Sequence, residues 1–156
     1  MDPSEFEYAG FWIRVWSHVI DTVLFLIILF PLLTAVYGRN YWSSDSVIQG
    51  PIDFLLSWVA PALAVILFWK YRQATPGKMA ISAQIVDAKT GGRPTVAQWI
   101  TRYVCYAVAA LPLFIGLIWV AFDPRKQGWH DKLAGTVVIR KKKGMTQAVQ
   151  FKEPGA

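Results

Sequence analysis

The sequence predicts an all-α membrane protein with two clear transmembrane helices, a third apolar block broken by proline, and a small cytoplasmic β element. The first observation is composition, because 54% of the 156 residues are hydrophobic. The second is that three long blocks, 22–38, 54–69 and 103–122, carry no charged residue, and each lies near the ~20 residues that a helix needs to cross a bilayer. The third is charge: of sixteen Lys and Arg, only Arg39 lies between the first two blocks.

The first helix is expected over residues 11–37, which is longer than a bilayer core, so that its first turns lie at the membrane interface. It does not read as a cleavable signal peptide, because the preceding segment MDPSEFEYAG is acidic and no small-residue cleavage site follows a short apolar core. The second helix is expected to begin at Pro51, a residue that suits the first helical turn, and to end near residue 71. Pro31, Pro61 and Pro112 each interrupt an apolar block, and we expect a kink at each.

Two short segments alternate like strands: MAISAQIVDA at 79–88, after a TPG turn, and LAGTVVIRKKK at 133–143. We expect them to pair with each other, which requires both to lie on the same side of the membrane. The block at 97–122 would then be a hairpin broken near Pro112 or a re-entrant segment. With about 26 residues it is short for two full crossings at ~1.5 Å per residue, and we favour a shallow or re-entrant pair over a simple third span.

The chain is expected to be a single membrane domain over residues 1–156, with a core at 8–143 and flexible tails at 1–7 and 144–156. Six Lys and Arg fall within 70–102 and seven within 125–143. Positive charge gathers on the cytoplasmic side of membrane proteins, so we expect the N-terminus and the basic segments in the cytoplasm and an integral protein of a bacterial inner membrane.

Three ionisable residues within the first helix are the leading candidates for a functional site. Arg14, His18 and Asp21 fall within a narrow sector at ~100° per residue and share one helix face. Ionisable groups in a span normally face the protein interior and pair, or mark an ion path. The alternative is structural: Arg14 extends to the headgroups, His18 lies at the interface, and Asp21 is neutral or held by Arg102.

Further candidates surround the third block. Arg102 opens it, and Asp123, Arg125, His130 and Asp131 follow it closely. In the functional interpretation His130 and Asp131 cap a pocket that includes the first helix. In the structural one, Asp123 begins a turn with the following proline and residues 129–132 anchor the chain at the interface. We attribute Asp53 to a favourable charge at a helix N-terminus.

The sequence offers no case for an enzyme, a metal site or a cofactor. It contains no glycine-rich phosphate loop, HExxH, CxxC or nucleophile elbow. One cysteine, Cys105, and two histidines cannot supply a zinc site of the usual kind. The positive charge flanks apolar spans instead of forming a basic face with interleaved aromatics, which argues against nucleic acid. Contact with anionic lipid remains an expectation for Arg140, Lys141, Lys142 and Lys143.

Four segments together resemble the RDD family of small membrane proteins, a family named for one arginine and two aspartates. They are YAGFWIRVWSHVIDTVLF, ATPGKMAISAQIVDAKTGGRPT, ITRYVCYAVAALPL and FDPRKQGWHDKLAGTVVIRKK. On this resemblance Arg14 matches the family arginine and Asp21 the aspartate in the first helix. Asp131 is our choice for the second aspartate, with Asp123 as the other candidate.

The resemblance implies a link to transport, since some members are associated with sodium/proton antiport, while others look like accessory subunits of larger assemblies. We therefore expect one of two functions. The chain is either a proton- or ion-coupled transporter in which Asp21 binds a proton or monovalent cation, or a scaffold that docks a membrane partner. As a transporter it would be a homo-oligomer, because so few spans cannot enclose an aqueous path alone.

Overall fold

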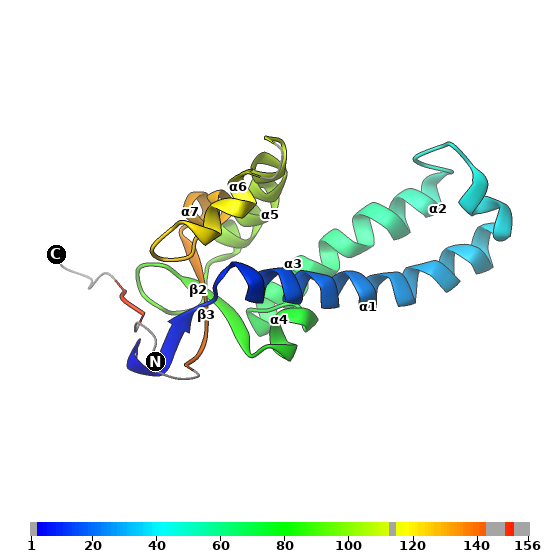
Figure 1. The fold of residues 1–156 in the computed structure, drawn as a ribbon. Helices are drawn as coiled ribbons and strands as arrows, with labels where there is room; N and C mark the ends of the chain where they lie inside the picture. The colour runs from blue at the N-terminus through cyan, green and yellow to red at the C-terminus, as the bar shows by residue number, and fades with distance from the viewer. Residues whose placement is uncertain (1–2, 113–114, 143–148, 152–156) are drawn as a thin grey trace.

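The computed structural model describes residues 3–112, 115–142 and 149–151. Its longest feature is a helical hairpin (Figure 1). One arm is α1 (Phe11–Tyr37), and the other runs through α2 (Pro51–Phe54), a π-helical turn (Leu55–Val59) and α3 (Ala60–Arg72). The arms have 27 and 22 residues and are apolar enough to span a membrane. The two predicted spans are confirmed at nearly the predicted bounds.

The prolines act on these helices in different ways. Helix α1 continues through Pro31. In the second arm the π-helical turn ends just before Pro61, and Ala60 donates its backbone N–H to the carbonyl of Leu55. Proline has no N–H to give to the carbonyl four residues earlier, and a wider turn of this kind is one way in which a helix accommodates the missing bond.

The loop that joins the two arms is tied down by Asp53. Its carboxylate accepts hydrogen bonds from the hydroxyls of Tyr41 (2.7 Å) and Ser57 (2.7 Å) and from the backbone N–H of Gln49 (2.8 Å). The charge of Asp53 therefore does more than complement a helix dipole, because its oxygens hold the loop against the start of α2.

At the opposite end of the hairpin lies a small antiparallel sheet in the order β1-β3-β2. Strand β2 (Ala83–Asp87) pairs with β3 (Thr136–Lys141), with Ile85 opposite Val138. The predicted pairing is confirmed, although both strands are shorter than expected. Residues 76–80 form helix α4 (Pro76–Ala80), where a turn and the start of a strand were predicted, and Lys143 lies outside the described residues.

The third strand, β1 (Phe6–Tyr8), was not predicted. It follows a 3₁₀ turn (Pro3–Glu5) and pairs with the other edge of β3, so that Glu7 lies opposite Arg140. Phe6 and Glu7 are buried. The expectation of a flexible tail at 1–7 is therefore wrong for these two residues, while residues 1–2 and most of 144–156 lie outside the described part.

Both faces of the sheet are covered, which explains the run of buried valines and isoleucine in β3. One face packs Ile85 and Val138 against two tryptophans, Trp69 of α3 and Trp99. The other face forms a cluster of Phe6, Val86, Ala88, Val137, Ile139 and Val149. The sheet is thereby joined to the base of the helical hairpin through an apolar core.

The third apolar block folds as two pieces, α5 (Val96–Ala110) and α6 (Ile115–Ile118), the second continuing as a 3₁₀ turn (Trp119–Ala121). A capping box begins α5, in which Thr95 and Gln98 satisfy each other's backbone N–H groups. The pieces meet at 116° across a break that includes Pro112. Strand β2 precedes this block, and β3 follows it after α7 (Trp129–Ala134). Because β2 and β3 pair with each other, both ends of the block lead to the same sheet.

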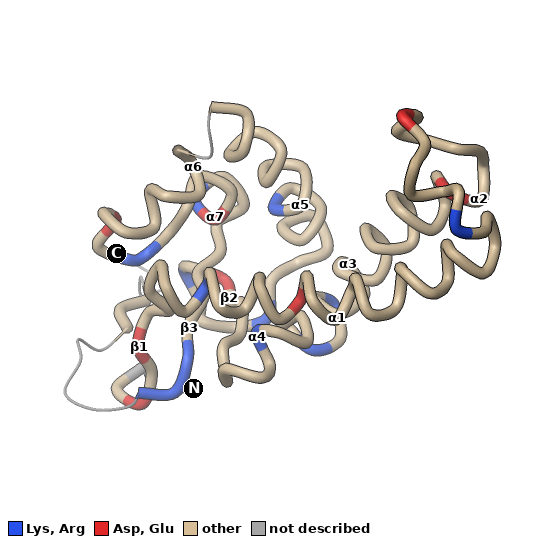
Figure 2. Tube along the Cα trace, turned by 45° about the vertical axis from the view of Figure 1, so that its right-hand side comes forward, with Lys and Arg blue, Asp and Glu red and all other residues tan. Residues whose placement is uncertain are grey.

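Positively charged residues gather at the end of the molecule that holds the sheet. Figure 2 shows most Lys and Arg around the sheet, α4, α7 and the sheet-side ends of the long helices, while the middle of the hairpin is nearly free of them. The predicted fold class is confirmed: two apolar spans, a broken third candidate and a small sheet.

Candidate functional site

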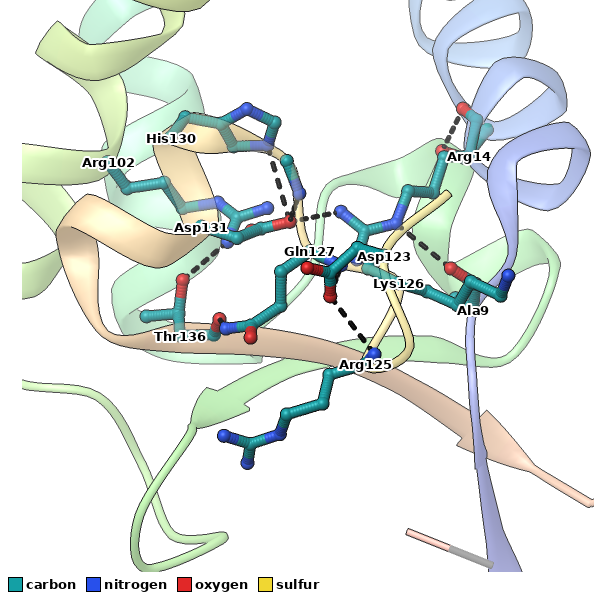
Figure 3. A network of polar contacts seen from close by, with 12 residues as sticks. Ala9, Arg14, Arg102, Asp123, Arg125, Lys126, Gln127, His130, Asp131 and Thr136 are labelled. Atoms are coloured by element: carbon teal, nitrogen blue, oxygen red, sulfur yellow. Dashed lines mark hydrogen bonds and ion pairs between the residues drawn. The ribbon is translucent and has the colours of Figure 1, made fainter. Parts of the chain in front are cut away.

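Arg14 lies in the first turns of α1 and is almost completely buried. Its guanidinium donates from Nε to the carbonyl oxygen of Ala9 (3.0 Å), from Nη2 to that of Lys126 (2.5 Å), and from Nη1 to Oδ2 of Asp131 (2.5 Å). Figure 3 shows this side chain reaching from α1 to the segment around α7. A planar fork of donors suits such a role, since it makes several directed bonds at once.

Asp131, in the first turn of α7, is fully buried at the centre of this network. One carboxylate oxygen accepts from Arg14 and from the backbone N–H of Gly128 (3.2 Å), and the other accepts from Arg102. Burial alone would raise the pKa of Asp131, but the guanidinium groups of Arg102 and Arg14 hold that pKa below its ordinary range. Asp131 is therefore a permanent anion at neutral pH.

Arg102 enters from α5 and is fully buried. Its Nη1 donates to Asp131 and to the hydroxyl of Thr136 in β3 (2.6 Å), and its guanidinium carbon lies 5.4 Å from the ring centre of Trp69 and 5.8 Å from that of Tyr106. Among the described residues, its Nε and Nη2 have no hydrogen-bond partner. We call Arg14, Arg102 and Asp131 the ion cluster; it joins α1, α5, α7 and β3 and holds two positive charges against one negative.

His130 lies beside the ion cluster. Its ring stacks on Tyr106 with centroids 4.0 Å apart, and its Nε2 is 3.5 Å from Oδ2 of Asp131. Neither ring nitrogen has a hydrogen-bond partner in the part of the chain that the structure describes. Burial lowers the pKa of His130 from 6.5 to about 3, and the carboxylate of Asp131 opposes this only in part. The imidazole is therefore neutral at physiological pH.

Asp123, the other candidate for the second family aspartate, does not join the ion cluster. It accepts from the backbone N–H groups of Arg125 (3.0 Å) and Gln127 (3.2 Å) and pairs with the side chain of Lys132. The guanidinium of Arg125 turns away to the carbonyl of Ala88 (2.7 Å). Asp123 thus organises the turn before α7, as the structural interpretation of this segment expected.

Asp21 lies apart from Arg14, against helix α4. Its carboxylate accepts from the hydroxyl of Thr75 (2.5 Å) and from the backbone N–H of Gly77 (2.7 Å). The contact of Asp21 with Arg102 offered by the structural alternative is therefore wrong, and in the described part of the chain Arg14 pairs with Asp131 and not with Asp21. Although Arg14 and Asp21 share a helix face, two turns of rise separate them by about 10 Å along the axis, so each meets a different neighbour.

The contact between α1 and α4 depends on Gly77. A Cβ at this position would lie 2.1 Å from the carbonyl oxygen of Ser17 and 2.8 Å from Cγ of Asp21. Glycine therefore lets the backbone of α4 touch α1 directly, and the Asp21 carboxylate occupies the start of α4, where backbone N–H groups are free.

The same close approach buries Lys78, which sequence reasoning missed. Its side chain is 2% exposed, and its Nζ lies 3.5 Å from the hydroxyl oxygen of Thr75. No carboxylate in the described part of the chain lies within ion-pair distance of Nζ, which is 4.0 Å or less. Burial lowers the pKa of the Lys78 amino group. A glycine beside a lysine in TPGK was the one available signal, because it indicates a close backbone approach.

Two cavities meet at this point. The first, of about 570 Å³, lies between α1, α3 and α5, and the second, of about 450 Å³, lies between α1 and α6. Four side chains line both: His18, Thr22, Lys78 and Tyr106. The ring of His18 meets that of Tyr106 edge-on at 6.1 Å. His18, Tyr106 and His130 thereby form a row that leads from the cavities to the ion cluster.

The predicted site residues therefore divide into groups. Arg14, Arg102, His130 and Asp131 come together, Asp21 and His18 lie beside the cavities with Lys78, and Asp123 and Arg125 stabilise a turn. Within the described ranges, no three His, Cys, Asp or Glu side chains gather as they would around a metal ion.

Comparison with known proteins identifies a family of membrane proteins to which this chain is similar. The model of the RDD family matches residues 8–135. An uncharacterized protein of Rickettsia prowazekii, RP437, is 43% identical over 75 residues, which cover 48% of this chain and 41% of that protein. Uncharacterized membrane protein YteJ of Bacillus subtilis is 29% identical over 162 residues, which cover 90% of this chain and 88% of that protein.

A second Bacillus subtilis relative, the uncharacterized protein YxaI, is 28% identical over 149 residues, covering 85% of this chain and 97% of that protein. The chain thus spans less than half of the Rickettsia relative and most of the two Bacillus relatives. No solved structure gives a significant match.

Proposed function

The chain belongs to the RDD family of membrane proteins, and on that premise we propose that it moves a proton or a monovalent cation across its membrane. The observation that carries the proposal is the polar group at the end of the larger cavity. Asp21, Thr75 and Lys78 form a short series, with the Thr75 hydroxyl 2.5 Å from Asp21 and 3.5 Å from Nζ of Lys78. Ionisable groups placed together within a membrane protein are typical of proton and ion paths.

In this proposal Asp21 binds the proton or cation, and the charge on Lys78 depends on whether it is bound. A positive charge on Lys78 is unfavourable in a buried site, and it is more favourable when Asp21 is ionised. The charge on Asp21 therefore affects the charge on Lys78, and the reverse also holds. His18, which lines both cavities, would stand between this site and the ion cluster.

The ion cluster has a different role in the proposal. Both oxygens of Asp131 are already occupied by Arg14 and Arg102, which suits a fixed anchor better than a group that exchanges protons. We propose that it fixes α1 to α5 and α7, so that Asp21 and Lys78 keep their positions. Arg14 then acts on Asp21 only indirectly, through the placement of α1.

The proposal places the protein in a bacterial inner membrane with the sheet, α4 and α7 on the cytoplasmic side, because the basic residues gather there. The bent pair α5 and α6 is then a re-entrant hairpin. Arg140, Lys141, Lys142 and Lys143 would contact anionic headgroups, and the functional unit would be a homo-oligomer. No chemical reaction is part of the proposal.

The test is ion flux through the purified protein in sealed liposomes under imposed proton and sodium gradients. Asp21→Asn should abolish coupled flux, since the amide cannot ionise, whereas Asp45→Asn in the exposed loop between the spans should leave it unchanged. Full flux in Asp21→Asn, with the protein folded, would refute the assignment.

A second candidate function is that of an accessory subunit. The observation that favours it is the exposure of α1. Only 6% of the apolar stretch that would span the membrane is buried against the rest of the chain. Such a helix can bind a partner as readily as lipid. Purification from native membranes without crosslinking would support this function if a second membrane protein came along in fixed stoichiometry, and absence of flux would add to that support.

A further inference from the structure

We infer that the cavity between α1, α3 and α5 binds one anionic amphiphile, with its acidic head at Lys78 and its acyl chain between α1 and α3. The inference goes beyond the proposed function and does not depend on ion movement. It rests on the shape of the cavity, on the distribution of polar atoms along its wall, and on the charge of Lys78.

The cavity is polar at one end only. His18, Asp21, Thr75 and Lys78 lie at the end near α4, and the other lining residues are largely apolar. On α1 the apolar wall continues from Leu24 to Ile28, and on α3 from Phe68 back to Pro61. These segments lead away from the sheet into the membrane-spanning part of the hairpin. A single acyl chain is linear and apolar, and it can therefore pack along such a wall.

The volume agrees with a small lipid-like ligand. At about 570 Å³, the cavity falls within the range of roughly 300–1,000 Å³ usual for small-molecule sites, which combine apolar walls with a few polar groups. The cavity also lies between membrane helices, so an acyl chain can enter from the bilayer without crossing water.

One cation that lines the cavity, Lys78, has no direct ion pair in the described part of the chain, and the Thr75 hydroxyl lies between it and the carboxylate of Asp21. Arg14 and Arg102 share Asp131. The two oxygens of Asp21 accept from Thr75 and Gly77. Lys78, which lines the cavity and is 2% exposed, is left without a carboxylate at ion-pair distance in the described part of the chain. A buried ammonium is costly unless it is paired, and the acid group of an amphiphile would pair with it.

The acid could be the carboxylate of a fatty acid or the phosphate of an anionic phospholipid, and both offer oxygens to Nζ of Lys78. The experiment is native mass spectrometry of the full chain, purified in a non-ionic detergent and titrated separately with oleic acid, lysophosphatidylglycerol and lysophosphatidylcholine. We expect one equivalent of an anionic probe to bind about tenfold more tightly than lysophosphatidylcholine. The stronger of the two anionic probes identifies the source.

Variants distinguish recognition of the acidic head group from binding of the acyl chain. Lys78→Met should reduce anionic binding to the level of lysophosphatidylcholine, Lys78→Arg should retain the preference, and Lys70→Met, at an exposed position outside the cavity, should change nothing. Ala64→Trp, which fills the apolar wall, should abolish binding of all three probes. Thermal unfolding of each variant checks that it is folded.

Equal binding of charged and zwitterionic probes by the wild type would overturn the inference, as would undiminished binding in Ala64→Trp, because the probes would then adsorb elsewhere. Retention of the anionic preference in Lys78→Met would overturn the role of the amino group. All measurements are made in detergent without an ion gradient, so failure of binding and failure of transport are separate results.

Discussion

Arg14 of α1 and Asp131 of α7, 117 positions apart in the chain, form a buried ion pair with Nη1 2.5 Å from Oδ2. Arg102 completes it from α5. Asp21, the aspartate of the first helix that we matched to the family on resemblance, lies against α4 and has no part in the pair. The three residues predicted to match the family motif therefore have two roles: Arg14 and Asp131 join α1 to α7, and Asp21 fixes α4 beside a cavity.

This division predicts a specific energetic coupling. In a double-mutant cycle, Arg14→Met and Asp131→Asn should couple by about 1–3 kcal/mol, as contacting residues in one network do. Arg14→Met and Asp21→Asn should be additive within about 0.5 kcal/mol, because the two side chains share no partner. The free energy of unfolding, measured by denaturant titration in one fixed detergent, provides both cycles.

The single variants in these cycles have an expected order. Asp131→Asn should be the most destabilising, by about 3–5 kcal/mol, since it leaves two buried guanidinium groups without an anion. In Arg14→Met, Asp131 keeps Arg102. An additive first cycle, or coupling between Arg14 and Asp21 instead, would contradict the arrangement described above.

The contact between α1 and α4 predicts a steric effect at Gly77. Gly77→Ala should destabilise the protein by about 1–3 kcal/mol, the usual cost of overpacking, because the new Cβ would lie 2.1 Å from the carbonyl oxygen of Ser17. Gly10→Ala is the matched control, since a Cβ there meets nothing within 4 Å. Thermal unfolding of the two variants should differ clearly; equal midpoints would mean that α4 does not pack tightly on α1.

His130 predicts a dependence of stability on pH. Its pKa is 6.5 when unperturbed and about 3 in the folded protein, so between these values the unfolded chain binds a proton that the folded chain does not. The free energy of unfolding should therefore fall as the pH drops below 6.5, by about 2–3 kcal/mol at pH ~4.5. The lowered pKa of Asp131 acts in the same direction, but only below the ordinary carboxyl range near pH 4.

The measurement is made in a His18→Gln background, where His130 is the only histidine, because the chain has two. Adding His130→Phe, which keeps a ring to stack on Tyr106, should remove the slope between pH 6.5 and 4.5. The stability above pH 7 is the reference for both chains. A slope that persists without His130 would assign the effect to other groups.

Much of the fold followed from local patterns, and most of the site did not. Continuous apolar blocks predicted both spans, and alternation predicted the pairing of β2 with β3. Strand β1 has three residues, too few for alternation to show. A helical wheel places Arg14 beside His18 and Asp21 because it describes neighbours on one helix only. The partner of Arg14 comes from α7, whose position depends on the sheet and on α5.

The burial of Lys78 also could not be predicted from local sequence patterns. In the sequence it is one of two lysines in the polar connection at 74–95, and a solvated position is the ordinary expectation for a lysine. Its burial results from the packing of α4 on α1, which requires the absence of a side chain at Gly77 and the carboxylate of Asp21 at the start of α4. No periodicity within 74–95 reports that contact.

The last prediction concerns the third apolar block. Because β2 and β3 pair directly, residues before and after the block should face the same side of the membrane. In a Cys105→Ala background, single cysteines at Thr90 and Lys141 should react with a membrane-impermeant maleimide from one side, and a cysteine at Ser46, in the loop joining the spans, from the other. All three positions are exposed, so accessibility and not burial decides the outcome. Labelling of Thr90→Cys and Lys141→Cys from opposite sides would make the block a full third span, and the sheet could not then form within one chain.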